Sequence, residues 1–176
     1  MADKYLVVVD MQKDFVTGSL GTKEAEAVVS RVTEKVKNFD GIVVFTQDTH
    51  FEDYLGTQEG RMLPVKHCIK ATDGWRLIPQ LESLAEEKQC RIFEKNTFGS
   101  VELADFLRQR YIQNELESVE LIGLCTDICV ISNALLIKAY MPELTVKVDA
   151  GCCAGVTPDK HDAAIQVMES CQIVVE

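Results

Sequence analysis

Polar residues that could carry out covalent chemistry follow several short apolar runs of the sequence. Asp10 ends the run Tyr5–Val9, Lys95 follows the run that closes at Glu94, and Cys129 follows the run through Gly123. A carboxylate, an ammonium group and a thiol can together supply the base, the stabilising charge and the nucleophile of a covalent mechanism. Taken singly, each residue type is also common in a polar loop.

Cys129 is the sharpest of these residues because the segment Gly123–Val130 leaves a predicted strand, turns and begins a helix. With Thr126 or Asp127 as the N-cap, the thiol would lie in the first helical turn. We expect that position to lower the thiol pKa and to offer backbone N–H donors to an oxyanion. A buried structural cysteine is the competing interpretation, and Cys125 and Cys129 could instead share a metal at helical spacing.

Asp48 and His50 are two residues apart in an extended segment, so their side chains are expected on the same side. His67 and Glu59 lie in the same irregular segment, Asp48–Pro79. A mixed carboxylate and imidazole set favours zinc, manganese or iron over a metal that selects thiolates. The alternative is a group of loop residues that make local hydrogen bonds.

The seven cysteines, an odd number, suggest reduced thiols in a cytoplasm, because a secreted disulfide scaffold is usually shorter and evenly paired. The seven cysteines stand at positions 68, 90, 125, 129, 152, 153 and 171. The adjacent pair Cys152 and Cys153 is compatible with buried packing or with redox chemistry, and the sequence leaves their roles open. His161 is expected to be a surface or packing residue of the last helix.

Short apolar runs alternate with amphipathic stretches along the chain, and this alternation predicts the elements that position the reactive residues. The predicted strands are Lys4–Val9, Gly41–Thr46, Cys90–Glu94, Val119–Gly123, Thr145–Val148 and Gln172–Val175. The predicted helices are Thr22–Phe39, Ile78–Glu87, Val101–Tyr111, Asp127–Met141 and Pro158–Glu169. The pattern indicates a three-layer α/β/α fold in which helices cover both faces of a mostly parallel, six-stranded sheet.

Ligands of such sheets bind beyond the carboxyl ends of the strands. Asp10, Asp48, Lys95 and Cys129 all follow predicted strands, so we expect them to meet on one rim. The segment Asp48–Pro79 is long and poorly periodic, and segments of that kind inside a compact domain are usually functional.

Length and charge limit the classes of partner. The 176 residues are enough for one core, so we expect a single domain over residues 1–176. Eighteen basic and 28 acidic side chains give a formal charge of −10, which disfavours nucleic acid and anionic lipid as partners. Neither a signal peptide nor a membrane span is apparent, and a cytoplasmic protein is expected.

The chain resembles the isochorismatase-like cysteine hydrolases, and most closely their nicotinamidase/pyrazinamidase branch. The matching motifs, in chain order, are Val9–Phe15 with Gly18–Leu20, Thr46–His50, Leu63–Cys68 with Thr72–Gly74, Lys95–Phe98, Gly123–Val130, and Val148–Ala150 with Gly155, Pro158 and Asp159. The motifs around Asp10 and Cys129 are specific for this family when both occur in this order and at this separation, although either motif alone is weak evidence. The resemblance extends over most of the chain and implies a single isochorismatase-like hydrolase domain.

Carried over residue by residue, the resemblance implies a catalytic triad of Asp10, Lys95 and Cys129. It also implies a cis peptide at Leu124–Cys125 and an oxyanion hole formed by the backbone N–H groups of Cys125 and Cys129.

The resemblance further implies metal positions at Asp48, His50 and His67, with one divalent zinc, manganese or iron ion. Many nicotinamidases have another histidine shortly after the Asp-x-His pair, and this chain does not. Glu59 is the expected replacement, with Glu52 and Asp53 as alternatives. Finally, the resemblance places Phe15, Leu20 and Phe98 around the ring of the substrate.

The implied activity is deamidation of nicotinamide or pyrazinamide to the acid and ammonia through a cysteine thioester, as part of NAD salvage. Members of the family are often oligomeric, so the resemblance also implies a homo-oligomer. A hydrolase of the same fold that acts on a carbamoyl or ureido group is the nearest alternative. A non-catalytic α/β module that binds a small ligand is another, and a thiol–disulfide protein that uses Cys125 and Cys129 is a third.

Overall fold

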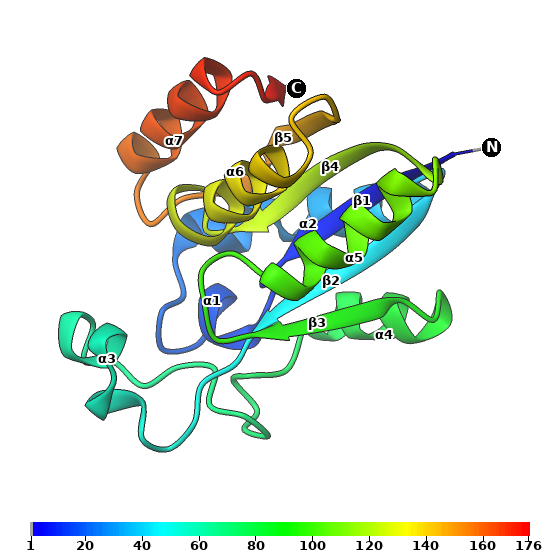
Figure 1. Ribbon diagram of the computed structural model, residues 1–176. Helices are drawn as coiled ribbons and strands as arrows, with labels where there is room; N and C mark the ends of the chain where they lie inside the picture. Colours follow the sequence, from blue (N-terminus) through cyan, green and yellow to red (C-terminus); the bar gives the residue numbers. More distant parts are fainter. Residues whose placement is uncertain (1) are drawn as a thin grey trace.

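The computed structural model describes residues 2–176 and contains a six-stranded sheet in which every pair of neighbouring strands is parallel. The strands lie in the order β3-β2-β1-β4-β5-β6 (Figure 1). Their bounds are β1 Asp3–Val9, β2 Ile42–Asp48, β3 Arg91–Lys95, β4 Leu116–Leu124, β5 Thr145–Ala154 and β6 Val174–Val175. The predicted parallel α/β sheet is therefore confirmed.

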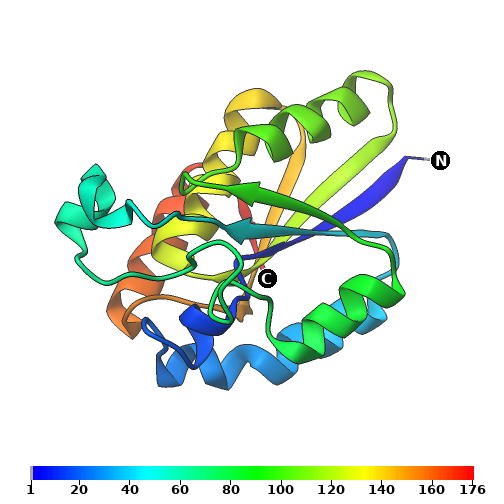
Figure 2. The same cartoon turned by 90° about the horizontal axis from the view of Figure 1, so that it is seen from below.

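Helices cover both faces of the sheet, as Figure 2 shows along the layers. The helices are α1 Lys13–Val16, α2 Lys23–Asn38, α3 Gln58–Met62, α4 Pro79–Glu87, α5 Val101–Ile112, α6 Ile131–Tyr140 and α7 Pro158–Ser170. Apolar side chains of α2 and α4 pack with one face, and those of α5, α6 and α7 pack with the other. Leu6–Val9 in β1 are fully buried because both faces of this central strand are covered.

The order of the strands creates a switch point between β1 and β4. The chain adds β2 and β3 on one side of β1, and then returns to add β4, β5 and β6 on the other. The connections that leave the carboxyl ends of two such neighbouring strands run to opposite sides, and a crevice remains between them. Asp10 follows β1 and Cys125 follows β4, so the crevice lies between two of the predicted site residues.

The segment Asp48–Pro79 is less irregular than expected. It contains a 3-10 turn at Tyr54–Gly56 and the short helix α3, whose N-cap Thr57 accepts a hydrogen bond from the N–H of Gly60. Elements of three to five residues are too short to show a hydrophobic period, so the sequence pattern could not reveal them. In Figure 1, α3 projects from the body of the molecule.

Strand β5 continues to Ala154, beyond its predicted end at Val148, and β4 begins at Leu116, before its predicted start at Val119. Two further boundaries differ from the prediction for identifiable reasons. The last strand is only Val174–Val175, because Gln172 has a positive φ of 65° and the N–H of Ile173 bonds to the end of α7 at Met168. The expected helix from Asp127 begins instead with a π-turn at Thr126–Val130, and α6 follows it. Among residues 2–176, no helix combines the length and apolar composition needed to traverse a bilayer.

Candidate active site

Asp10, Lys95 and Cys129 meet at the carboxyl edge of the sheet. The Nζ atom of Lys95 lies 2.6 Å from Oδ2 of Asp10 and 3.5 Å from Sγ of Cys129. All three residues are buried, and Asp10 is fully enclosed. The structure therefore brings together the three predicted catalytic side chains, whereas their roles remain predictions.

Thr46 orients the carboxyl group of Asp10. Its Oγ1 donates a hydrogen bond of 2.7 Å to Oδ1 of Asp10, which leaves Oδ2 to Lys95. Asp10 has a positive φ of 47°, and its own N–H is directed at the carbonyl oxygen of Thr46, 3.3 Å away. Thr46 was not among the predicted site residues; its only signal was a buried hydroxyl at the end of an apolar strand.

The charges of this cluster oppose the expected activation of the thiol. Burial and the carboxyl group of Asp10 raise the pKa of Cys129 far above that of a free cysteine, although Lys95 acts in the opposite direction. The prediction of a lowered thiol pKa is therefore wrong, because the turn is buried beside an acid. Burial also raises the pKa of Asp10, whereas Asp10, Cys129 and Asp48 together raise that of Lys95 despite its burial. The shifts therefore favour the neutral form of the thiol, beside an ammonium group and a carboxyl group that contact each other.

The turn that carries Cys129 has an unusual backbone. The peptide bond Leu124–Cys125 is cis, as the resemblance implied. The carbonyl oxygen of Cys125 accepts hydrogen bonds from the N–H groups of Ile128 and Val130, at 3.1 and 3.0 Å, and skips the N–H of Cys129 between them. The N–H of Cys129 thus does not share this carbonyl oxygen, which is compatible with its expected role as an oxyanion donor.

Thr126 and Asp127, the residues expected to cap this helix, form hydrogen bonds with other partners. The hydroxyl of Thr126 pairs with Nδ1 of His161 at 2.8 Å, and the carboxylate of Asp127 accepts a bond from the N–H of Val156. Neither side chain caps the turn, because both connect it to the start of α7. His161 is accordingly a half-buried packing residue with a defined partner.

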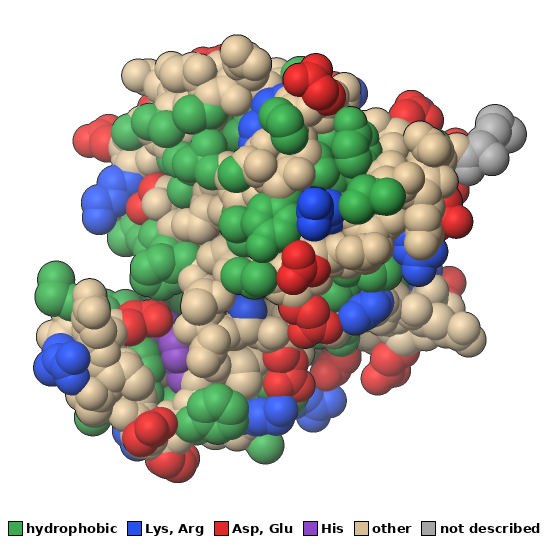
Figure 3. Space-filling model, viewed as in Figure 1, with side chains coloured by type: hydrophobic (Ala, Val, Ile, Leu, Met, Phe, Trp, Pro, Cys, Tyr) green, Lys and Arg blue, Asp and Glu red, His purple; other side chains and the backbone are tan. Residues whose placement is uncertain are grey.

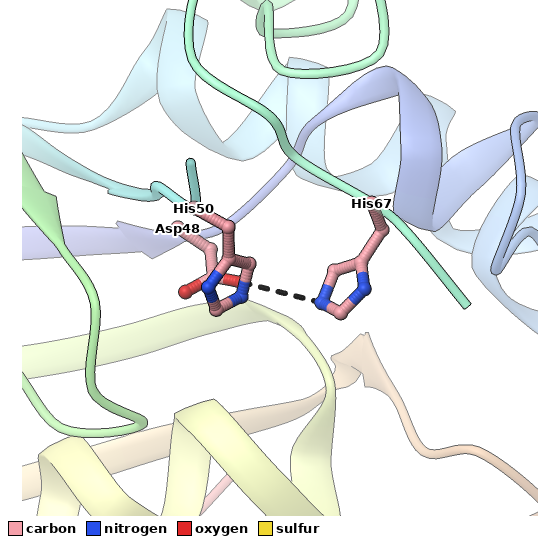
Figure 4. A group of neighbouring side chains, drawn as sticks. All are labelled: Asp48, His50 and His67. Carbon is pink, nitrogen blue, oxygen red and sulfur yellow. Dashed lines mark ion pairs between the residues drawn. The ribbon is translucent and has the colours of Figure 1, made fainter. Parts of the chain in front are cut away.

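Asp48, His50 and His67 form a second group beside this cluster (Figure 4). One ligand-type atom from each lies within 4.8 Å of the others, and all three residues are buried. Oδ2 of Asp48 is 3.0 Å from Nε2 of His50 and 3.7 Å from Nε2 of His67. Asp48 ends β2, whereas the two histidines begin and end the loop that contains α3.

Glu59 points at the same place from α3. Its Oε1 lies 3.5 Å from Nε2 of His50 and 3.7 Å from Nε2 of His67. Glu52 is instead on the surface, where it pairs with Lys66 at 2.9 Å, and Asp53 is exposed. Of the three predicted alternatives for a fourth ligand, the structure therefore brings only Glu59 to the histidines.

The hydrogen bonds around this group suit a bound cation. Nδ1 of His67 lies 2.8 Å from the carbonyl oxygen of Val65, so a neutral His67 donates there and presents the lone pair of Nε2 to two carboxylates. A lone pair that faces carboxylate oxygens is unfavourable unless a positive charge lies between them. Against the effect of burial, Asp48 and Val65 raise the pKa of His67, whereas His50, His67 and Lys95 hold that of Asp48 well below its usual range.

Two buried residues that sequence reasoning missed support this group. Gln12 donates from Nε2 to the carbonyl oxygens of Asp48 and Trp75, at 2.8 and 2.9 Å, and its Oε1 accepts from the N–H of Asp48 at 2.8 Å. Tyr54 is fully buried against both imidazole rings, with centroid separations of 4.7 and 5.0 Å. Its hydroxyl donates to the carbonyl oxygen of Leu63 at 2.9 Å and so ties the loop to the site.

A pocket of about 700 Å³ opens onto both groups. Cys125 and Cys129 line one wall, and Asp48, Glu59 and His67 line another. The pocket also contains the three residues that were expected around the substrate ring, namely Phe15, Leu20 and Phe98. Figure 3 shows a histidine side chain within the recess between α3 and the body of the molecule.

The seven cysteines are all free thiols. Apart from Cys125 and Cys129, they are Cys68, Cys90, Cys152, Cys153 and Cys171. Cys152 and Cys153 are both buried, and burial raises the pKa of Cys152 to about 11. Such thiols are poor nucleophiles at neutral pH. No described contact gives this adjacent pair a redox role.

Comparison with known proteins places these features in a family context. The family model described as "Isochorismatase domain" matches residues 4–176. An isochorismatase family protein of Bacillus subtilis, PncA, is 28% identical over 173 residues, which cover 92% of each chain. A crystal structure titled as nicotinamidase PncA from Bacillus subtilis shares 27% identity and superposes with a TM-score of 0.79, with 98% of both chains covered. The pyrazinamidase of Pyrococcus horikoshii in complex with zinc has 26% identity and a TM-score of 0.81, covering 99% of this chain and 98% of that one.

Proposed function

Because this chain belongs to the isochorismatase family, we propose that it is a cysteine-dependent amidase that deamidates nicotinamide, and also pyrazinamide, to the acid and ammonia. Solved structures that resemble it over nearly their whole length carry the names nicotinamidase and pyrazinamidase. The single observation that carries the proposal is the position of Lys95, whose Nζ contacts both Asp10 and Cys129 beneath the pocket.

In the first half of the reaction, Asp10 accepts the proton of the Cys129 thiol as the sulfur attacks the carboxamide carbon. A raised pKa makes Asp10 a stronger base than an ordinary aspartate, and Lys95 stabilises the charges that form. The N–H groups of Cys125 and Cys129 receive the oxyanion. One such donor is typically worth about 3–4 kcal/mol of barrier. Asp10 then gives the proton to the amide nitrogen. The C–N bond breaks, ammonia departs, and the acyl group stays on Cys129 as a thioester.

In the second half, water takes the place of ammonia. Asp10 accepts a proton from this water as its oxygen attacks the thioester carbonyl, and the same two N–H groups receive the second oxyanion. The C–S bond breaks, the acid leaves, and the proton held by Asp10 returns to the sulfur of Cys129. The division of one difficult hydrolysis into two easier steps is the advantage of covalent catalysis.

Asp48, His50 and His67, with Glu59, would hold one divalent ion of the zinc, manganese or iron class. When bound, such an ion acts as a Lewis acid that can accept the ring nitrogen of the substrate. The chain's own contribution is the orientation of the ring: Phe15 and Phe98 line the same pocket as Asp48, His67 and Cys129. Correct orientation of a bound amide accounts for a large part of the acceleration in reactions of this kind.

An ammonia-release assay tests the proposal. Nicotinamide, pyrazinamide and a carbamoyl compound would each be offered to the protein, with zinc, manganese or iron, and with a chelator. We expect release from the two ring amides, and a rise in KM when the chelator is present. Release from the carbamoyl compound alone would instead identify a related hydrolase, and no release from any of the three would refute the amidase.

A further inference from the structure

Asn133 is a buried polar residue in the interior of α6, where an apolar residue would be the ordinary choice. It is the third residue of the helix and is 1% exposed. An amide side chain in such a position costs helix stability and desolvation unless its hydrogen bonds are made. Asn133 makes three, all to backbone atoms.

These three bonds join the nucleophile to the wall of the pocket. The Nδ2 atom donates to the carbonyl oxygen of Cys129 at 2.8 Å and to that of Phe98 at 3.2 Å. The Oδ1 atom accepts from the N–H of Ser100 at 2.9 Å. One amide therefore holds the turn that carries the thiol together with the β3–α5 loop that carries an aromatic lining residue.

Besides its bonds to Asn133, the β3–α5 loop has one internal side-chain hydrogen bond, from Oγ1 of Thr97 to the carbonyl oxygen of Gly99 at 2.7 Å, which does not tie the loop to α6. Phe98 is 47% exposed, so burial of its ring does not hold it firmly. Gly99 lies so close to α6 that an added Cβ would approach the carbonyl oxygen of Ser132 to 3.1 Å. Ser100 is the N-cap of α5, and its hydroxyl is already occupied by the N–H of Leu103. The position of Phe98 relative to Cys129 is thus set by the Asn133 amide and the close packing of Gly99.

We propose that Asn133 is a positioning residue that fixes Phe98 at the correct distance from Cys129 for a ring-bearing amide. This inference rests on the proposed amidase function. Asn133 touches neither the substrate nor the reacting atoms, and it acts through the loop. Its loss should therefore weaken ring binding more than it disturbs the sulfur, because the turn of Cys129 is also held by the bonds of Thr126 to His161 and of Asp127 to Val156.

The variant Asn133→Ser should keep the hydrogen bond to the turn of Cys129 and lose the bonds to the β3–α5 loop. A serine in a helix can still donate to the carbonyl four residues earlier, here that of Cys129, but it is too short to reach the loop. We expect its KM for nicotinamide to rise roughly tenfold with a smaller change in kcat, short of the hundredfold that a displacement of about 1 Å can cost. Asn38→Asp on the surface of α2 serves as a control, and Asn133→Asp as a second variant that retains only the acceptor.

A double-mutant cycle with Phe98→Ala provides the decisive readout. If Asn133 acts through Phe98, the serine substitution should have little further effect on kcat/KM in the Phe98→Ala background. Alkylation of Cys129 by iodoacetamide should stay close to the wild-type rate. The melting temperature should decrease because the buried N–H of Ser100 loses its acceptor, so the assays are made well below the melting temperature of every variant. Independent, multiplicative effects of the two substitutions would overturn the inference, as would a loss of kcat and alkylation without a change in KM. Absence of amide hydrolysis by the wild-type protein would instead refute the proposed function.

Discussion

At the scale of single residues, the site is a small network in which each charge depends on its neighbours. Lys95 contacts Asp10 at 2.6 Å and Asp48 at 3.4 Å. One ammonium group therefore links the triad to the group of predicted metal ligands that includes Asp48. Such a buried cation would be costly without its carboxylate partners. The same burial raises the pKa of the Cys129 thiol, so the proposed mechanism relies on Asp10 as the base.

The raised pKa of Asp10 predicts the acid limb of the pH profile. Asp10 must be ionised to accept a proton, so kcat/KM should fall as the pH decreases through its pKa. Because burial raises this pKa, the fall should occur at a higher pH than the value near 4 of an ordinary aspartate. Measurement of kcat/KM with saturating metal, from about pH 4 to 9, tests this. An acid limb at or below 4 would show that Asp10 ionises easily.

Thr46 offers a more local test of the same base. The variant Thr46→Val removes the hydroxyl that donates to Asp10 while it preserves the shape of the side chain. The lost hydrogen bond had favoured the carboxylate, so the acid limb should move to still higher pH. We also expect kcat to decrease by about tenfold, the effect of roughly 1.4 kcal/mol. Thr33→Val, which removes a hydroxyl bonded to Val29 within α2, should leave both quantities unchanged.

At the scale of elements, the site depends on how the ends of strands are held. The backbone of Asp48 is fixed by the side-chain amide of Gln12, which makes two hydrogen bonds to it and a third to Trp75. Tyr54 performs the corresponding task for the loop that carries Glu59, because it packs on both histidines and bonds to Leu63. Gln12 and Tyr54 therefore determine where the side chains of the predicted metal ligands can point.

The Gln12→Glu substitution tests the first of these supports. It preserves the size of the side chain and the acceptor for the N–H of Asp48, but it removes the two donated hydrogen bonds. Changes behind a metal ligand typically reduce metal affinity by about 10–100-fold, and we expect a loss in that range. Competition of the protein with a zinc chelator measures it. Gln109→Glu on the exposed side of α5 is the matched control, and equal affinities in both variants would contradict the assigned role.

At the scale of the whole molecule, the sheet could be predicted because its strands are nearly continuous apolar runs separated by amphipathic stretches. The amphipathic stretch Thr22–Phe39 predicted a helix, and α2 forms there with Val28, Val32 and Val36 buried. The rim that gathers Asp10, Asp48, Lys95 and the Cys129 turn followed from the parallel topology alone. Each of these residues is adjacent to a strand end, and a one-residue error in a boundary does not move it far.

The elements that could not be predicted are those whose form depends on tertiary contacts. The π-turn at Thr126–Val130 replaces an expected α-helical start because its side chains are bonded to α7 and its carbonyl hydrogen bonds skip Cys129. The short elements around Tyr54 carry no periodic signal. Likewise, the pKa of the thiol follows from complete burial beside Asp10, which a position in a helical turn does not reveal.

Binding of a metal should stabilise the whole fold, because its expected ligands come from β2 and from the loop that contains α3. A ligand present at about 100 times its Kd contributes roughly 2.7 kcal/mol, and each kcal/mol raises the melting temperature of a chain of this size by about 2–4 °C. Zinc should therefore raise the melting temperature by several degrees. The same addition to His50→Ala should have almost no effect. An equal rise in both proteins would place the ion elsewhere.

The most direct test of the account is the turnover of nicotinamide by Cys129→Ala, measured as ammonia release beside Cys171→Ala, which removes an exposed thiol. We predict that Cys129→Ala retains its fold and loses at least about a thousandfold in kcat, since loss of a catalytic nucleophile commonly costs more than that. Cys171→Ala should match the wild type. Deamidation by Cys129→Ala at the wild-type rate would contradict the mechanism.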